Sequence, residues 1–395
     1  MPDEINPSPV GTLGTVSAEA HRAASTTEVL AFEVPGRWPV EKAQAWYRQQ
    51  PWLVGCNYIP ATAINQLEMW QAATFDPQTI ARELDLAHSL GFNCLRVYLH
   101  DLVWADHPEG LYQRMDHFLE ICSRHQMRTI FVFFDDCHRP FPFTGPQPAP
   151  VPAYHNSGWM NSPARDIATA FSENRLPAPE IGRLRDYLQA TLTRFAEDPR
   201  VLLWELYNEP GREFPIGQEG QAWFGDRSAA LLLASWQWAR AVAPSQPICS
   251  TAEGSVGTQN IALAKLNSDV HSFHNYDSPD ILEKLCQLYA EDPRPSICTE
   301  YMARPQSTFQ SSLPIFKKYS IGAINWGLVA GKTGTIWPWS SKDGRELNQP
   351  WEKEATNPPG QPLPEPADIW FHDIFRTDGT PFDPEEITFL RQIIQ

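Results

Sequence analysis

The stretch that decides the fold is residues 201–210, which read Val-Leu-Leu-Trp-Glu-Leu-Tyr-Asn-Glu-Pro. Residues 201–207 have the length and the apolar composition of a buried strand. The run ends abruptly in Asn208, Glu209 and Pro210, and a proline cannot continue a central strand. A single carboxylate at the end of a buried strand, with an amide before it, is placed for chemistry rather than for packing.

The pattern recurs at Glu300, which follows the short apolar run at residues 296–299. Taken alone, each glutamate fits a solvated residue at the end of a strand. Taken together, two carboxyl groups on two strand ends are what hydrolysis of a glycosidic bond requires. One protonates the leaving oxygen, and the other attacks the sugar carbon or activates a water. The sequence therefore predicts Glu209 and Glu300 as a catalytic pair.

An alternation of short and long segments indicates the fold. Apolar runs typical of strands occupy residues 52–58, 93–99, 128–134, 201–207, 247–251, 269–274, 296–299 and 321–326. Helical patterns occupy residues 79–90, 115–125, 180–197, 220–242, 279–290, 308–319 and 384–394. This order predicts an α/β protein, a single-domain (β/α)8 barrel (TIM barrel) over residues 31–395. A doubly wound open sheet is the alternative, but the Gly-rich phosphate turn that it needs is missing from the sequence.

Two connections are much longer than a barrel requires, residues 135–179 after the third strand and residues 327–384 after the eighth. Long loops are usually functional or disordered, and the many Trp and Phe residues in both are poor residues for disorder. We therefore expect both loops to fold over the mouth of the barrel. The candidates for a wall at one end of the cleft are Trp159, His155, Trp337 and Trp339.

The composition excludes several classes of partner. A net charge of −16 argues against nucleic acid and against an anionic membrane. No run of about eighteen apolar residues is present to cross a bilayer. The 7 cysteines are odd in number and lack paired metal-binding spacing, which indicates reduced thiols. Residues 1–30 show no signal peptide and predict a flexible tail. We expect a cytoplasmic protein.

From about Trp52 to Trp326 the chain resembles the clan A glycoside hydrolases, retaining (β/α)8-barrel enzymes such as the family 5 cellulases and mannanases. In that clan the acid/base glutamate follows an asparagine at the end of the fourth strand, and the nucleophile ends the seventh. Glu209 and Glu300 stand on the fourth and seventh predicted strands. The resemblance therefore implies that Glu209 is the acid/base and Glu300 the nucleophile.

Arg96 is a charge in the middle of the second predicted strand, so it needs a carboxylate partner. Glu205, also inside a strand, is one candidate, and the resemblance implies the nucleophile as the other. An acid needs a raised pKa, so we also expect an apolar setting for Glu209, with Trp204 and Tyr207 close by.

The resemblance assigns roles to residues at two further strand ends and to Asn208 beside Glu209. His274 and Tyr276 match a His-x-Tyr motif whose tyrosine donates to the nucleophile. Trp326 stands where the clan places an aromatic platform under the sugar. Asn208 would hydrogen-bond the 2-hydroxyl of that sugar, a contact that strengthens in the transition state.

Other residues near the predicted strand ends are candidate ligands of sugar hydroxyls, although loop structure explains each equally well. They are Tyr58, His100, Asp101, Asp135, Asp136 and His138. Trp70, in the first loop, is a candidate for the lining of the cleft. Asp135, Asp136 and His138 form a cluster without a distant third ligand, which is weak evidence for a metal, so we predict neither a metal nor another cofactor.

We therefore expect a retaining β-glycosidase for a neutral β-linked oligosaccharide or glycoside of gluco, manno or xylo type. The long loops favour exo action in a closed pocket. An endo-β-glycanase and a transglycosylase of the same clan are alternatives within the enzymes. A non-catalytic carbohydrate-binding barrel is the alternative of another class, suggested by the missing export signal. The expected partner is a carbohydrate, and the sequence carries no signal for an oligomeric state.

Overall fold

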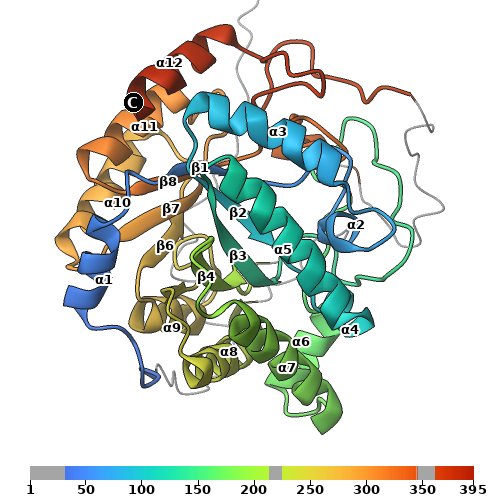
Figure 1. Cartoon of the computed structure of the whole chain (residues 1–395), viewed down its shortest axis with the longest axis vertical. Helices are drawn as coiled ribbons and strands as arrows, with labels where there is room; N and C mark the ends of the chain where they lie inside the picture. The colour runs from blue at the N-terminus through green and yellow to red at the C-terminus, as the bar shows by residue number, and fades with distance from the viewer. Residues whose placement is uncertain (1–31, 213–224, 344, 346–360) are drawn as a thin grey trace, which may run out of the picture. The chain divides into compact units, whose positions relative to one another are not determined.

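The structure is a computed structural model that describes residues 32–212, 225–343, 345 and 361–395 (Figure 1). The tail predicted at residues 1–30 lies outside the described residues, as does the start of the helix predicted at 220–242. Within the part that is described, no helix is long and apolar enough to span a membrane.

Eight parallel strands form the barrel that the sequence predicts. They are β1 (Val54–Asn57), β2 (Cys94–Tyr98), β3 (Arg128–Asp135), β4 (Val201–Asn208), β5 (Ile248–Cys249), β6 (His271–His274), β7 (Ser296–Tyr301) and β8 (Gly322–Trp326). Sequence neighbours pair along the sheet, and β1 pairs with β8. The order runs from β5 through β1 to β6, so β5 and β6 must meet to close the ring.

The junction of β5 and β6 is the thinnest part of the barrel. β5 has only 2 residues, and one parallel bridge, between Thr251 just after β5 and Ser272 of β6, joins this part of the chain to β6. Backbone hydrogen bonds add to the contact, from the Ala252 N–H to the Ser272 carbonyl (2.9 Å), from the Asp269 N–H to the Ile248 carbonyl (2.9 Å) and from the His274 N–H to the Glu253 carbonyl (2.8 Å). The barrel therefore closes through a short seam.

Helices surround the strands (Figure 1). They are α1 (Val40–Arg48), α2 (Gln66–Trp70), α3 (Pro77–Leu90), α4 (Asp101–Asp106), α5 (Pro108–Arg124), α6 (Arg165–Ser172), α7 (Ala178–Phe195), α8 (Ala229–Val242), α9 (Thr258–Asn267), α10 (Pro279–Glu291), α11 (Phe309–Lys318) and α12 (Pro384–Ile394). The seven predicted helices are present, but α1, α2, α4, α6 and α9 were not predicted. α6 lies inside the long connection after β3, where the sequence predicted no helix.

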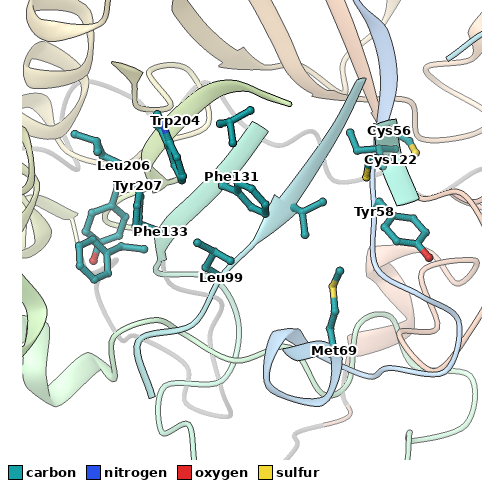
Figure 2. Close-up of a cluster of buried hydrophobic side chains, with 14 of the residues drawn as sticks. Cys56, Tyr58, Met69, Leu99, Cys122, Phe131, Phe133, Trp204, Leu206 and Tyr207 are labelled. Carbon is teal, nitrogen blue, oxygen red and sulfur yellow. The ribbon is translucent and has the colours of Figure 1, made fainter. Parts of the chain in front are cut away.

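Period-2 alternation gives the strands two buried faces. Cys94, Ile130 and Leu203 point into the barrel and form its apolar floor, against which Trp46 and Tyr47 of α1 pack. Residues on the opposite face pack under the helices. Figure 2 shows part of this outer layer, in which Phe131, Phe133 and Trp204 lie close together. Trp204 stacks on Phe131 with ring centroids 5.6 Å apart and on Phe133 at 5.4 Å.

The long loops after β3 and β8 meet each other. The His155 N–H donates to Ser341 Oγ (3.0 Å), and the His155 ring bonds the Trp337 carbonyl through Nδ1 (2.7 Å). Arg345 donates from Nη2 to the Pro152 carbonyl (3.0 Å). Segments nearly two hundred residues apart in sequence are therefore joined over the same end of the barrel.

Candidate active site

Glu209 and Glu300 meet at the carboxyl ends of β4 and β7. Glu209 directly follows β4, whereas Glu300 is the penultimate residue of β7, which runs two residues further than predicted. One oxygen of each carboxylate and a ring nitrogen of His274 all lie within 4.8 Å of one another. Both glutamates are buried, with 8% and 6% of their surface exposed. The two carboxylates are therefore both buried and close to each other.

Three side chains donate to Glu300. Arg96 donates from Nη1 to Oε1 (2.8 Å), and the Tyr98 hydroxyl donates to the same oxygen (2.8 Å). The Tyr276 hydroxyl donates to Oε2 (2.8 Å). These contacts fix both oxygens of Glu300, since each has at least one donor of its own.

Arg96 contacts both of its candidate partners. It donates to Glu205 through Nε (2.9 Å) and Nη2 (2.7 Å), and it reaches Glu300 through Nη1. The same fork donates to the amide oxygens of Asn57 (2.8 Å) and Asn208 (2.7 Å). Burial opposes the charge, but Glu205, Tyr98 and Glu300 outweigh it and raise the pKa of Arg96. The guanidinium stays charged and orders the site from inside the barrel.

The setting of Glu209 differs from the apolar one predicted. Arg212 Nε lies 2.8 Å from Oε2, His274 Nδ1 lies 2.8 Å from Oε1, and the Cys137 thiol lies 3.3 Å from Oε2. Burial would raise the pKa of Glu209, but Arg212 and His274 lower it to about 2. The prediction of a raised pKa is therefore wrong for this conformation.

The two aromatic residues expected beside Glu209 point elsewhere. The Trp204 indole donates to Gln246 (3.1 Å) on the helix-facing side of β4. The Tyr207 hydroxyl donates to Asp136 (2.7 Å). Period-2 alternation along β4 explains the error for Trp204, because it sends residues 204 and 206 to the opposite face from Glu205.

Asp136 holds the turn that carries Glu209. Its carboxylate accepts from the Gly211 N–H (2.7 Å), from Tyr207 and from the Ser228 hydroxyl. Glu209 itself has a φ of +40°, which is uncommon for a residue other than glycine and indicates a strained backbone. Asp136 was predicted as a sugar ligand, but its oxygens are committed to this turn, so that assignment is withdrawn.

Asn208 uses its whole amide. Its oxygen accepts from Arg96, and its nitrogen donates to Asp135 Oδ1 (2.9 Å) and toward Cys137 Sγ (3.5 Å). Sulfur is a weak acceptor, so the second hydrogen is the one that a sugar hydroxyl could take. Asp135 also accepts from the Trp159 indole (2.6 Å), and burial raises the pKa of its carboxyl to about 7.

Three aromatic rings line the site on the β1, β2 and β8 side. Trp326 ends β8 and is half-buried. Its ring lies 5.6 Å from Trp159 and 6.0 Å from Tyr98, and Tyr98 lies 5.0 Å from Trp159, all edge to face. The loop after β3 thus brings Trp159 against the residue proposed as the sugar platform.

Three further predicted residues are structural. His100 accepts from the Leu102 N–H through Nδ1 (3.2 Å) and bonds the Asn161 carbonyl through Nε2 (2.9 Å). Asp101 accepts from the Ser162 hydroxyl (2.9 Å) and from Arg183 (2.7 Å). Both anchor the loop after β3 rather than facing the site. Trp70 is fully buried and donates to the Tyr98 carbonyl (2.8 Å), so it belongs to the core and not to the cleft.

Tyr58 and His138 are also engaged within the protein. The Tyr58 hydroxyl donates to Glu83 (2.9 Å), and burial raises the pKa of Glu83 to about 7. His138 Nε2 lies 3.2 Å from the Asn156 amide, and its Nδ1 lies 3.4 Å from Lys342 Nζ. Burial lowers the pKa of His138.

Two of the four predicted wall residues, His155 and Trp339, gather behind Tyr276. Trp339 packs edge to face on Tyr276, with ring centroids 5.1 Å apart, and His372 lies 5.6 Å from the same ring. His155 lies 5.4 Å from His372 and 6.3 Å from Trp339. Both long loops therefore support a side chain that donates to Glu300. Trp337 lies further out and donates to the Pro364 carbonyl (3.2 Å).

The close set of Glu209, His274 and Glu300 has the donor types of a metal site. Arg96 and Arg212 are bonded to the same carboxylates, however, and two guanidinium charges there would repel a cation. The predicted Asp135, Asp136 and His138 cluster has oxygens already bonded to separate donors. We therefore assign a metal to neither group.

Sequence reasoning missed Asn57, Tyr98, Cys137 and Arg212. Tyr98 had a signal, because it stands two residues after Arg96 on the same strand and must share its face. Asn57 ends β1 and Cys137 follows β3, so both positions also mark the carboxyl edge of the barrel. Nothing in the sequence indicated the contact of Arg212 with Glu209, because that contact depends on the turn after β4.

No protein-family model matches the sequence, and no curated protein matches it. Solved structures share its fold. An endo-β-1,4-mannanase from Thermotoga petrophila has a TM-score of 0.52 and 13% identity, over 88% of this chain and 77% of that one. An exo-β-1,4-mannosidase from Opitutaceae bacterium strain TAV5 has a TM-score of 0.55 and 17% identity, over 87% of this chain and 59% of that one. A glycoside hydrolase family 5 mannosidase from Rhizomucor miehei has a TM-score of 0.51 and 15% identity, over 87% of this chain and 93% of that one. At such identities the likeness establishes the fold, and the chain has the (β/α)8 barrel of these glycoside hydrolases.

Proposed function

We propose that the protein is a retaining β-glycoside hydrolase, with Glu300 as nucleophile and Glu209 as acid/base. The observation that carries the proposal is that an oxygen of one carboxylate lies within 4.8 Å of an oxygen of the other. Retaining enzymes hold their carboxyl groups roughly 5–5.5 Å apart, whereas inverting enzymes leave about 6.5–9.5 Å for a water. The spacing here suits direct attack on the sugar.

The different settings of the two glutamates support the assignment of roles. Glu300 is fixed by Arg96, Tyr98 and Tyr276, as a nucleophile aimed at the anomeric carbon needs to be. Of the three partners of Glu209, Arg212 is only half-buried and lies at the edge of the site. In the first step Glu300 bonds to the anomeric carbon while Glu209 protonates the departing oxygen. In the second step Glu209 takes a proton from a water that releases the sugar.

The charge on Glu209 in this conformation fits the second step, because a general base must be unprotonated. The first step requires a proton on Glu209, and Arg212 opposes it. We infer that a bound substrate places its glycosidic oxygen beside the Glu209 carboxylate and displaces the Arg212 guanidinium from it, so that Glu209 can carry the proton.

The proposed substrate is a neutral β-linked oligosaccharide or glycoside that is cleaved from one end. The joined loops after β3 and β8 support exo action, since they cover one side of the site. β-Mannosides are the first sugars to test, because the similar solved structures are mannanases and mannosidases. We also propose a reducing, cytoplasmic compartment, since all seven cysteines are buried and unpaired.

Azide rescue tests the two roles separately. Glu300→Ala should lower kcat by about 10⁴-fold or more. Any turnover that azide restores should yield the α-glycosyl azide, with inverted configuration. Glu209→Ala should still form the intermediate from an aryl glycoside with an activated leaving group, and azide should then yield the β-glycosyl azide.

Glu365→Ala is the control, because Glu365 forms an exposed ion pair with Arg376 and lies outside the proposed machinery. It should retain the wild-type rate. If Glu300→Ala gave the β-glycosyl azide and Glu209→Ala the α-glycosyl azide, the two roles would be reversed. Hydrolysis of the β-glycoside that first releases the α-anomer of the sugar would exclude a retaining mechanism.

A further inference from the structure

A small pocket adjoins the proposed nucleophile. Its walls include the rings of Tyr98, Trp159 and Trp326 on one side and the side chains of Thr333, Thr335 and Asp373 from the loop after β8 on the other. The Tyr98 hydroxyl donates to Glu300, so the pocket begins one side chain away from the carboxylate that would attack the sugar.

The pocket is placed by the turn that follows the sugar platform. Gly327 comes directly after Trp326 and has a φ of +83°. A Cβ at this position would lie 2.5 Å from Asp373 Oδ1, so only glycine allows the carboxylate to pack against the turn. Asp373 is 2% exposed, and its carboxylate also accepts from the Leu328 N–H. The end of β8 and the buried carboxylate therefore hold each other in place.

The hydroxyls of the pocket form a chain with a fixed direction. Thr335 donates its hydroxyl proton to Asp373 Oδ2 (2.7 Å). Thr333 Oγ1 lies 3.1 Å from Thr335 Oγ1, and because the Thr335 proton is already used, Thr333 must be the donor. The Thr333 oxygen then keeps its remaining lone pairs as acceptors at the outer end of the chain.

The other hydroxyl and amide side chains in the lining have partners of their own. Asn57 accepts from Arg96 and donates to the Thr299 carbonyl (2.7 Å). The Tyr58 hydroxyl donates to Glu83, and the Tyr98 hydroxyl donates to Glu300. Thr333 therefore offers the acceptor that a bound group could use.

The size of the pocket limits what that group can be. The space in it that a water-sized group can reach is about 10 Å³, which is room for about one such group. In a hexose the exocyclic carbon is joined to the anomeric carbon through the ring oxygen and one ring carbon. When the anomeric carbon lies against Glu300, that hydroxymethyl group is close enough to enter a pocket that starts at Tyr98.

We propose that this pocket takes the exocyclic hydroxymethyl group of a hexose, whose hydroxyl donates to Thr333 Oγ1, and that the protein therefore selects hexosides over pentosides. The inference rests on the proposed glycosidase function. It deepens that function, because it removes xylo-type glycosides from the substrates that the sequence allows.

The test compares kcat/KM on 4-nitrophenyl β-glucoside and β-mannoside with kcat/KM on 4-nitrophenyl β-xyloside, which lacks the hydroxymethyl group. The better hexoside should exceed the xyloside by about a hundredfold or more in the wild type. Thr333→Val keeps the shape but removes the acceptor, and it should lower this ratio about tenfold. Thr333→Ser should keep the wild-type ratio.

The ratio is the readout because a loss of folding lowers both rates together and leaves it unchanged. If Thr333→Val does not fold, Thr333→Ala gives the same comparison. The matched control is Thr388→Val on the exposed face of α12, which should change nothing. A wild type that cleaves the xyloside as well as the hexosides, or a Thr333→Val variant with an unchanged ratio, would overturn the pocket assignment alone. Failure to cleave any of the glycosides would overturn the proposed function and this inference with it.

Discussion

Arg96 connects more of the site than any other side chain described here. Its fork reaches a carboxylate inside β4 and another on β7, together with the amide oxygens that end β1 and β4. Lysine could not replace it, because one ammonium group cannot span four acceptors in fixed directions. Removing Arg96 would also leave Glu205 as an uncompensated buried charge, a loss of about 3–5 kcal/mol in unfolding free energy. Both partners weighed from the sequence are therefore real, and they are parts of one network.

Arg212 should control the pH range of the reaction. Glu209 must be protonated to act as an acid, and Arg212 is the strongest of the groups that lower its pKa to about 2. In Arg212→Gln that pKa should rise, so the alkaline limb of kcat/KM should move to higher pH. At pH 6 the rate on a substrate with a poor leaving group should gain about tenfold for each pKa unit.

A substrate with an activated leaving group needs no acid in the first step, so its kcat/KM should not show this gain. Arg175→Gln is the matched control, because Arg175 pairs with Glu173 on the exposed surface. An Arg212→Gln profile that overlays the wild type for the poor leaving group would mean that Arg212 does not set the protonation of Glu209.

At the scale of an element, the loop after β5 closes over the proposed acid/base. Gly254 has a φ of +114°, and a Cβ there would lie 3.0 Å from Glu209 Oε1 and 3.0 Å from His274 Nδ1. Gly254→Ala should therefore displace Glu209 and lower kcat by about 10²-fold. Backbone strain alone should cost about 1–2 kcal/mol in unfolding free energy.

Gly145→Ala is the control that separates the effect of backbone strain from the effect of displacing Glu209. Its φ is +93°, but nothing lies within 4 Å of an added Cβ. Gly145→Ala should lose a similar unfolding free energy, measured by urea denaturation, and keep its kcat. Equal activities in the two variants would mean that the approach of Gly254 to Glu209 has no catalytic consequence.

The strands could be predicted from the sequence, but most loop contacts could not. Glu209, Glu300 and Trp326 stand at ends of apolar runs, and the barrel topology alone brings those ends together. His100, Asp101 and Asp136 also stand at strand ends, and the same rule made them candidate ligands. Their actual partners, such as Asn161, Ser162 and Gly211, follow from loop conformations that no periodic pattern encodes.

Charge could be inferred only in part. A buried arginine such as Arg96 on β2 requires a carboxylate partner, and β4 supplies one in Glu205. The low pKa of Glu209 could not be inferred, because it depends on the turn that folds Arg212 back over three residues. The place of three pocket residues could not be predicted for a similar reason. The long connection after β8 brings Thr333, Thr335 and Asp373 back to the site, and its path follows from loop conformation.

At the scale of the whole molecule, the joined loops predict the products. A wall that covers one side of the site should admit the end of a chain and block its passage. Incubation with a β-linked oligosaccharide should therefore release one small sugar from the start, and the viscosity of a soluble β-mannan or β-glucan should change little. A rapid fall in viscosity with few reducing ends would show internal cleavage and exclude exo action.

The short seam between β5 and β6 is where the barrel should open locally most often. β2, β3 and β4 are paired with a neighbouring strand on both sides, whereas the seam has one bridge and a few backbone hydrogen bonds, so deuterium should replace the amide protons of the seam first. The His274 N–H bonds the Glu253 carbonyl at this point (2.8 Å), next to the Gly254 that covers Glu209. Each opening of the seam would therefore release the proposed acid/base from its neighbours, and a ligand that spans the seam would slow exchange at a distance from its own contacts.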